Sequence, residues 1–190
     1  MSIVLASASP RRKELLEMLG FKDMKIIPAK GEEVVEEGLA PGELVEQLAL
    51  QKAREVARSC GTEELIIAAD TIVWHEGRVF GKPRSAEEAK SMLMSLSGRT
   101  HQVYTGVALL LGEKELSRHE RSNVSFRRLS ESEAEAYIRS GEPMDKAGAY
   151  GAQGLGALFV KAIDGDFFNV MGLPLCSLGE MLKELGVNIL

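Results

Sequence analysis

A continuous apolar run, Leu65-Ile66-Ile67-Ala68-Ala69, constrains the fold of this chain more than any other feature. Runs of this length are typical of a strand that is covered on both of its faces. The run ends at Asp70-Thr71, where we expect the strand to end as well. Covering both faces of a sheet takes helices, so the run favours an α/β protein.

The rest of the pattern alternates strands with helices in the first half and indicates hairpins in the second half. We expect strands over residues 3–6, 25–28, 65–69, 101–111 and 115–128, and a second hairpin around Asp164-Gly165 that joins 157–163 to 167–171. We expect helices from Ser9-Pro10 to Gly20 and over about 42–59, 85–96, 130–140 and 174–185, with a loop from Lys30 to Gly38. Ser85 with Glu88 and Ser130 with Glu133 predict capping boxes for the helices at 85–96 and 130–140, and Glu76-Gly77 predicts a glycine turn. This order predicts a mixed twisted sheet flanked by helices, as two lobes with a central cleft, in a single domain over residues 1–190.

The composition excludes some classes of function. The formal net charge is −5, whereas proteins that bind nucleic acids usually present a net basic face, so no nucleic-acid partner is expected. Cys60 and Cys176 lack metal-type or redox-type spacing, which favours a reducing compartment. No signal peptide is visible, and no segment approaches the roughly 18 apolar residues of a membrane span, so no membrane partner is expected either.

The segment Ser7-Ala8-Ser9-Pro10-Arg11-Arg12-Lys13 places three cations in the first turn of a predicted helix. Basic residues are unfavourable there, because the helix N-terminus already carries the positive end of the macrodipole. A bound anion would resolve this conflict, since unpaired N–H groups, serine hydroxyls and arginine forks together make a phosphate site. The alternative is that these side chains extend into solvent.

Two further positions carry candidate charges. Lys52 falls on an otherwise aliphatic stripe of its helix, where a lysine either snorkels past the edge of the core or points into a polar cleft. Asp70 ends a buried strand, a common place for ligand-binding groups, although a turn aspartate would look the same. The loop with Lys82 and Arg84 adds cations, and Glu32-Glu33 adds carboxylates, which together make the inventory of phosphoryl-transfer chemistry.

Histidines 75, 101 and 119 show no ligand spacing, and we interpret them as structural or surface residues.

An ordered set of motifs resembles the Maf family of nucleotide pyrophosphatases, which is associated with septum formation, over essentially the whole chain. The motifs are Leu5–Arg12, Ala69–Thr71, Gly81–Pro83, Leu96-Ser97-Gly98 to His101, Gly141–Gly154 and Gly172–Pro174. The longest of them, GEPMDKAGAYGAQG, is the most discriminating.

The resemblance implies a fold similar to that of ITP pyrophosphatases and an enzyme that hydrolyses a nucleoside triphosphate between its α and β phosphates. It implies a divalent cation such as Mg or Mn as cofactor, a cytoplasmic location and a homodimer. The stretch from Lys146 to Gly154 is similar to the branch that acts on dTTP, UTP and modified pyrimidine nucleotides.

Matched by position, Asp70 would be the catalytic carboxylate. As a separate physical hypothesis, Asp70 with Glu33 would hold the metal or orient the attacking water. Substrate-binding roles would fall to Ser9, Arg11, Arg12, Lys52, Thr71, Lys82 and Gln153. Of these, Arg12, Thr71 and Gln153 would tune the choice of substrate.

Two alternatives stay open at this point. One keeps the enzyme class but changes the substrate to 7-methyl-GTP or an inosine-type purine. The other is a nucleotide-binding regulator of septum formation with little turnover, against which the set of Asp70, Lys52 and Lys82 weighs. Low aromatic content and overall acidity disfavour a nucleic-acid-binding module.

Overall fold

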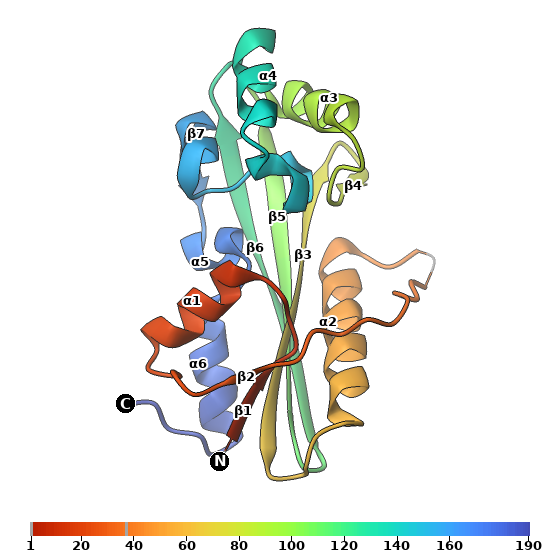
Figure 1. The fold of residues 1–190 in the computed structure, drawn as a ribbon, viewed down its shortest axis with the longest axis vertical. Helices are drawn as coiled ribbons and strands as arrows, with labels where there is room; N and C mark the ends of the chain where they lie inside the picture. Colours follow the sequence, from red (N-terminus) through yellow and green to blue (C-terminus); the bar gives the residue numbers. More distant parts are fainter. Residues whose placement is uncertain (1, 37) are drawn as a thin grey trace. The chain divides into compact units, whose positions relative to one another are not determined.

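A computed structural model describes residues 2–36 and 38–190, and its ribbon is drawn in Figure 1. Glu37, in the expected loop from Lys30 to Gly38, lies outside the described residues. The strands are β1 (Ser2–Leu5), β2 (Lys25–Ile26), β3 (Glu64–His75), β4 (Arg78–Phe80), β5 (Thr100–Leu111), β6 (Lys114–Phe126) and β7 (Val160–Asp164). The helices are α1 (Pro10–Met18), α2 (Pro41–Ala57), α3 (Ala86–Leu96), α4 (Glu131–Arg139), α5 (Phe167–Met171) and α6 (Leu175–Glu184). Three 3₁₀ helices, η1 (Glu142–Asp145), η2 (Ala147–Ala149) and η3 (Gly154–Phe159), follow α4.

The strands form one seven-stranded mixed sheet in the order β2-β1-β3-β5-β6-β7, with β4 paired to β3. β1 is parallel to both β2 and β3, whereas β4 and β7 pair antiparallel to their neighbours. The predicted mixed α/β fold is therefore confirmed. The chain divides into two compact units, and the central cleft stays a prediction.

Unit 1 comprises Met1–Asp70, Thr105–Glu120 and Gly172–Leu190. Its α2 lies alongside the first part of β3 (Figure 1) and packs small residues, Ala49 and Ala53, against Ile66 and Ala68 of that strand. The approach is closest at Gly106 of β5, where an added Cβ would lie 2.2 Å from the Val45 carbonyl oxygen. Only glycine fits at that distance, so this contact fixes α2 directly on the sheet.

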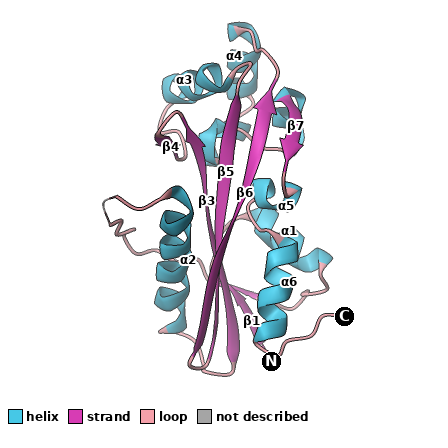
Figure 2. Ribbon diagram, turned by 180° about the vertical axis from the view of Figure 1, so that it is seen from behind, coloured by secondary structure: helices cyan, strands magenta, loops and turns pink. Residues whose placement is uncertain are grey.

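Unit 2 comprises Thr71–Tyr104 and Arg121–Met171. Its α3 and α4 lie side by side at one end of its strands (Figure 2) and share a buried core with Val73, Val103 and Phe126. The capping box predicted for α4 is confirmed, because Ser130 and Glu133 bond each other's backbone N–H. At α3 only half of the predicted box forms: Ser85 caps the helix, but the Glu88 side chain accepts from the N–H of Arg84 instead.

Two strand predictions are wrong. β3 does not end at Asp70 but continues to His75, because Ile72 and Val73 are themselves buried and the predicted turn at Glu76-Gly77 pairs β3 with β4. The second expected hairpin is absent from the described chain: β7 pairs with β6, and residues 167–171 form α5. The Asp166 side chain accepts from the N–H of Phe168 at 2.7 Å, as an N-terminal cap does, which starts this helix.

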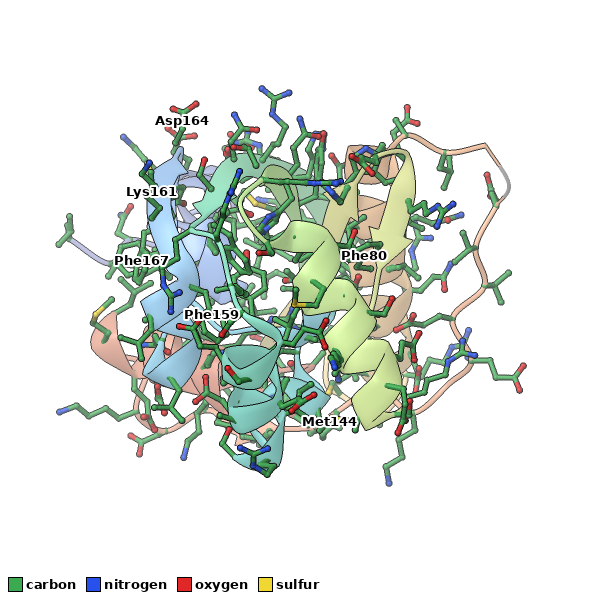
Figure 3. The ribbon with its side chains drawn as sticks, turned by 90° about the horizontal axis from the view of Figure 1, so that it is seen from above. Phe80, Met144, Phe159, Lys161, Asp164 and Phe167 are labelled. Atoms are coloured by element: carbon green, nitrogen blue, oxygen red, sulfur yellow. The ribbon has the colours of Figure 1, made fainter. Side chains whose placement is uncertain are left out.

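β7 is an edge strand of the sheet, at the opposite end of the strand order from β2. Its Lys161 and Asp164, both labelled in Figure 3, are exposed. Charged side chains on an edge strand discourage pairing with another chain.

No helix in the described part of the chain has the length and apolar character needed to cross a membrane.

Candidate active site

Asp70 lies at the polar end of the β3 face that α2 covers. Side chains alternate along a strand, so Asp70 shares its face with Ile66 and Ala68, which pack against α2. The Asp70 side chain is only 13% exposed. A carboxylate with so little contact with water needs a partner of opposite charge.

Lys52 of α2 is that partner. Its ammonium donates a hydrogen bond to Asp70 Oδ1 and lies 2.8 Å from Glu33 Oε1, so one cation bridges two carboxylates. The Lys52 side chain is 21% exposed, and its charged end is held by protein groups. Lys52 therefore pairs with charged groups of the protein instead of extending freely into solvent, and the polar cleft expected around it stays a prediction.

The loop that carries Glu33 is tied to the same helix. Glu55 Oε1 accepts from the N–H groups of Lys30 and Gly31 at 2.7 and 3.1 Å. Gln51 bonds both backbone groups of Val34, accepting from its N–H at 3.1 Å and donating to its carbonyl. Gln51 and Glu55 are four residues apart on α2 and flank Lys52, so one helix sets the position of both Lys52 and Glu33.

Arg12 of α1 is held by oxygens of unit 1. Its Nε donates to the Gly172 carbonyl at 2.8 Å, and its Nη1 donates to Ser7 Oγ at 3.0 Å. Burial lowers the pKa of the Arg12 guanidinium, the nearby Asp70 carboxylate opposes that effect, and Arg11 adds to it. The guanidinium still carries its charge at neutral pH, because the pKa of arginine starts far above 7.

The basic first turn of α1 is only partly as expected. The helix begins at Pro10 with Ser9 as its N-cap, but the Ser9 side chain makes no capping bond. Lys13 pairs with Glu17 at 3.5 Å, so protein groups already offset part of the positive charge. Ser9 and Arg11 are half-buried, and a bound anion at this turn stays a prediction.

Three expected substrate-binding residues, Thr71, Lys82 and Gln153, belong to unit 2. Thr71 follows Asp70 on β3, and the pleat of the strand turns the two side chains to opposite faces. Lys82 and Gln153 are exposed. The N–H of Gly148 donates to the Gly81 carbonyl at 3.0 Å, so the loop with Lys82 lies against the segment that leads to Gln153.

The donors around Lys52 suit a divalent cation. Asp70 and Glu33 each direct a carboxylate oxygen at one positive charge. Among the described residues, no group of three or more His, Cys, Asp or Glu side chains could hold a metal ion by itself. A site of one or two carboxylates completed by water and substrate phosphates is the kind that Mg²⁺ prefers, so this donor set fits.

The histidines are structural or paired, in agreement with the sequence. His75 and His101 are buried, and His101 Nε2 lies 2.7 Å from the Tyr150 hydroxyl. His119 Nδ1 is paired with Glu46.

Several residues that shape the site were not identified from the sequence, namely Gln51 and Glu55 on α2 and the Gly172 carbonyl that accepts from Arg12. The spacing of Gln51 and Glu55 around Lys52 was the available signal, because these three polar residues share one side of α2. Gly172 stands in one of the motifs of the resemblance, but nothing in the sequence links its carbonyl to Arg12, which is 160 positions away.

Comparisons with known proteins agree with this architecture. A family model described as Maf-like protein matches residues 2–185. A dTTP/UTP pyrophosphatase of Bacillus cereus is 48% identical over 187 residues, covering 98% of this chain and 97% of that protein. One of Bacillus anthracis is 47% identical over the same length and with the same coverage. The solved structure of a HAM1 protein from Coxiella burnetii is 21% identical with a TM-score of 0.56, covering 97% of this chain and 99% of that one, and shares the fold. The chain therefore belongs to the Maf-like protein family.

Proposed function

We propose that this protein is a nucleoside triphosphate pyrophosphatase that hydrolyses dTTP and UTP to the nucleoside monophosphate and pyrophosphate. The observation that carries the proposal is the cluster in which Lys52 bridges Asp70 and Glu33. Arg12 adds a desolvated cation within electrostatic reach of Asp70. Relatives that are 47–48% identical and named dTTP/UTP pyrophosphatase support the same activity and the same substrates.

In the proposed reaction, Asp70 is the catalytic carboxylate. It accepts a proton from a water molecule whose oxygen forms a bond to the α phosphorus. The bond from that phosphorus to the oxygen that bridges to the β phosphate breaks, and its electron pair leaves with pyrophosphate. Lys52 holds the Asp70 carboxylate in place through its hydrogen bond to Oδ1, so the base is oriented before substrate binds.

Cations of the protein stabilise the charge that collects on the departing pyrophosphate. Preorganised positive groups lower the barrier most where charge develops, because they need no reorganisation during the reaction. We assign this task to the cations Arg11, Arg12, Lys52 and Lys82, together with the neutral hydroxyl of Ser9 as a hydrogen-bond donor. Arg12 is the most preorganised of them, because hydrogen bonds to Gly172 and Ser7 already fix the position of its guanidinium.

A bound Mg²⁺ or Mn²⁺ would neutralise phosphate charge and polarise the phosphoryl oxygens. Asp70 and Glu33 would hold it, and Gln51 and Glu55 keep the Glu33 loop on α2 for that purpose.

Base choice is assigned to Thr71 and Gln153. A glutamine amide presents both a donor and an acceptor, as the edge of a pyrimidine does. A site built to bond one base discriminates strongly against bases that leave its polar groups unpaired.

The proposal also includes a single domain over residues 1–190, a cytoplasmic homodimer, and a link to arrest of cell division.

Pyrophosphate release from dTTP, UTP, CTP, 7-methyl-GTP and ITP, each with Mg²⁺ or Mn²⁺, tests the proposal. We expect rapid release from dTTP and UTP and little from the others. Preference for 7-methyl-GTP or ITP would overturn the pyrimidine assignment alone. Absence of metal-dependent turnover on every nucleotide would overturn the enzyme and favour a nucleotide-binding regulator.

A further inference from the structure

The carboxylate of Glu142, in unit 2, joins three separate segments of the chain. Its Oε1 accepts from the Tyr137 hydroxyl of α4 at 2.9 Å and from the N–H of Gly156 at 3.1 Å. Its Oε2 accepts from the N–H of Leu155 at 2.9 Å. One side chain at the start of η1 therefore holds the first turn of η3, which follows directly on Gln153.

The backbone around Gln153 is shaped to receive this carboxylate. Gly154 has a φ of 72°, and an added Cβ there would lie 2.7 Å from Glu142 Oε2. At Gly156 an added Cβ would lie 2.7 Å from the Tyr137 hydroxyl oxygen. Gly154 is needed for its left-handed conformation, and Gly156 for its close approach to the Gly151 carbonyl oxygen, 2.5 Å from an added Cβ, so glycines let this turn lie close to Glu142 and Tyr137.

The chemistry of the contact requires an ionised acceptor. Burial raises the pKa of Glu142, but hydrogen bonds from Leu155, Gly156 and Tyr137 outweigh burial, and the net pKa lies below the usual value. An ionised carboxylate only accepts, so it suits two backbone N–H groups and a hydroxyl at once. A glutamine amide would present its own N–H₂ to one of these donors.

Tyr137 extends the arrangement to the residues before Gln153. Its hydroxyl oxygen also accepts from the N–H of Gly151 at 3.2 Å. The segment is thus fixed on both sides of Gln153, by Tyr137 at Gly151 and by Glu142 at Leu155 and Gly156. The Gln153 side chain itself is exposed, so its direction depends on this backbone.

We propose that Glu142 is a positioning residue for base selection, which holds the Gln153 turn in the conformation that reads the pyrimidine. This inference rests on the proposed function, because it takes Gln153 to contact the base. Glu142 acts through Gln153, so its loss changes discrimination between bases more than the rate of the chemical step.

The test compares kcat/KM for dTTP with that for dCTP, two substrates that differ in the base edge. We expect Gln153→Ala and Glu142→Gln each to lower this ratio by about tenfold, as the loss of a specific hydrogen bond does. In Glu142→Gln the change should fall mainly on KM, with kcat for dTTP within about threefold of wild type. The double variant should match Gln153→Ala, because residues that act as one unit are not additive.

Glu133→Gln is the matched control. Glu133 also accepts from a backbone N–H, that of Ser130, and from the Arg127 side chain in the same unit, and both of these partners lie outside residues 151–156. It should lower the melting temperature and leave the dTTP to dCTP ratio unchanged. If Glu142→Gln does not fold, Tyr137→Phe removes two bonds of the same network, the one to Glu142 and the one from the N–H of Gly151, and should lower the ratio in the same direction.

The outcomes separate the two proposals. No pyrophosphate release by the wild type would overturn the proposed function. An unchanged ratio in Gln153→Ala would overturn both the base-reading role of Gln153 and this inference. A lowered ratio in Gln153→Ala with an unchanged ratio in Glu142→Gln, or fully additive effects in the double variant, would overturn the role of Glu142 alone.

Discussion

The ammonium of Lys52 on α2 is hydrogen bonded to the carboxylate of Asp70 on β3, and both side chains lie mostly out of water. The two residues meet because small side chains on α2 and Gly106 on β5 let the helix lie close to the sheet. The pair is thus a product of the packing of unit 1. Its chemical consequence is a base and a cation held together before any substrate arrives.

Replacement of Lys52 with Met keeps the stem and removes the charge. We expect kcat to fall by about 100- to 1,000-fold, because one preorganised electrostatic group is lost and Asp70 loses its anchor. Lys90→Met is the control, since Lys90 also bridges two carboxylates, Glu131 and Glu135, at 2.8 Å each, but on α3 and α4. Steady-state pyrophosphate release gives kcat for both variants, and equal activity of the two would contradict the role of Lys52.

Replacement of Arg12 with Lys keeps the charge and removes the guanidinium fork. We expect KM for dTTP to rise about tenfold, because a lysine cannot bond the Gly172 carbonyl and Ser7 together while it faces phosphate. Lys13→Ala, which removes an exposed pair with Glu17, should change KM by less than about twofold. Substrate titrations of the two variants make the comparison, and an unchanged KM in Arg12→Lys would place Arg12 outside the phosphate site.

Replacement of Glu55 with Gln loosens the loop that carries Glu33. The carboxylate accepts from Lys30 and Gly31, and these bonds lower the pKa of Glu55 below its usual value. We expect the Mg²⁺ concentration for half-maximal activity to rise several-fold with little change in kcat at saturating metal. Glu64→Gln removes a similar carboxylate that accepts from the N–H of Gly61 and should leave the metal requirement unchanged. Identical metal titrations for wild type and Glu55→Gln would refute the link between this loop and metal binding.

Stability should fall in mild acid because of His101. Burial, and to a lesser extent the neighbouring His75, lowers the pKa of His101 from 6.5 to about 3. Between these two values the unfolded chain binds a proton that the folded protein does not, so the free energy of unfolding decreases as the pH falls. The slope from one such group is about 1.4 kcal/mol per pH unit.

Urea unfolding at several pH values between 4.5 and 6.5 measures this effect. His101→Gln keeps a hydrogen-bonding group for the Tyr150 hydroxyl but does not titrate, so its stability should depend less on pH by about that slope. Parallel curves for wild type and variant would show that His101 does not lose its proton on burial.

The sequence predicted the core of the fold well where hydrophobic pattern and turn chemistry agreed. The apolar run at 65–69, the glycine turn at Glu76-Gly77 and the capping box at Ser130 were all found. The segment 167–171 was missed, because phenylalanine and valine favour strands, whereas the Asp166 cap and tertiary contacts make it a helix. Buried Asn169 donates there to the Val103 carbonyl and to Ser122 Oγ, which a strand in a hairpin with β7 would not provide.

For the site, the sequence indicated which types of residue take part, but not which of them contact one another. The aliphatic stripe that contains Lys52 does not indicate which carboxylate pairs with this lysine, because the pairing depends on how closely α2 approaches the sheet. Glu33 illustrates the point, since its place beside Lys52 depends on Gln51 and Glu55, whose spacing on α2 does not show which loop they bind.

The most direct test of the account is pyrophosphate release from dTTP by Asp70→Asn, measured together with nucleotide binding. This variant keeps the shape of the side chain and an oxygen for Lys52, but it cannot accept the proton. We predict a loss of at least about 1,000-fold in kcat, with an unchanged melting temperature and retained binding of dTTP. Turnover within about tenfold of wild type would contradict the assignment of Asp70 as the catalytic carboxylate.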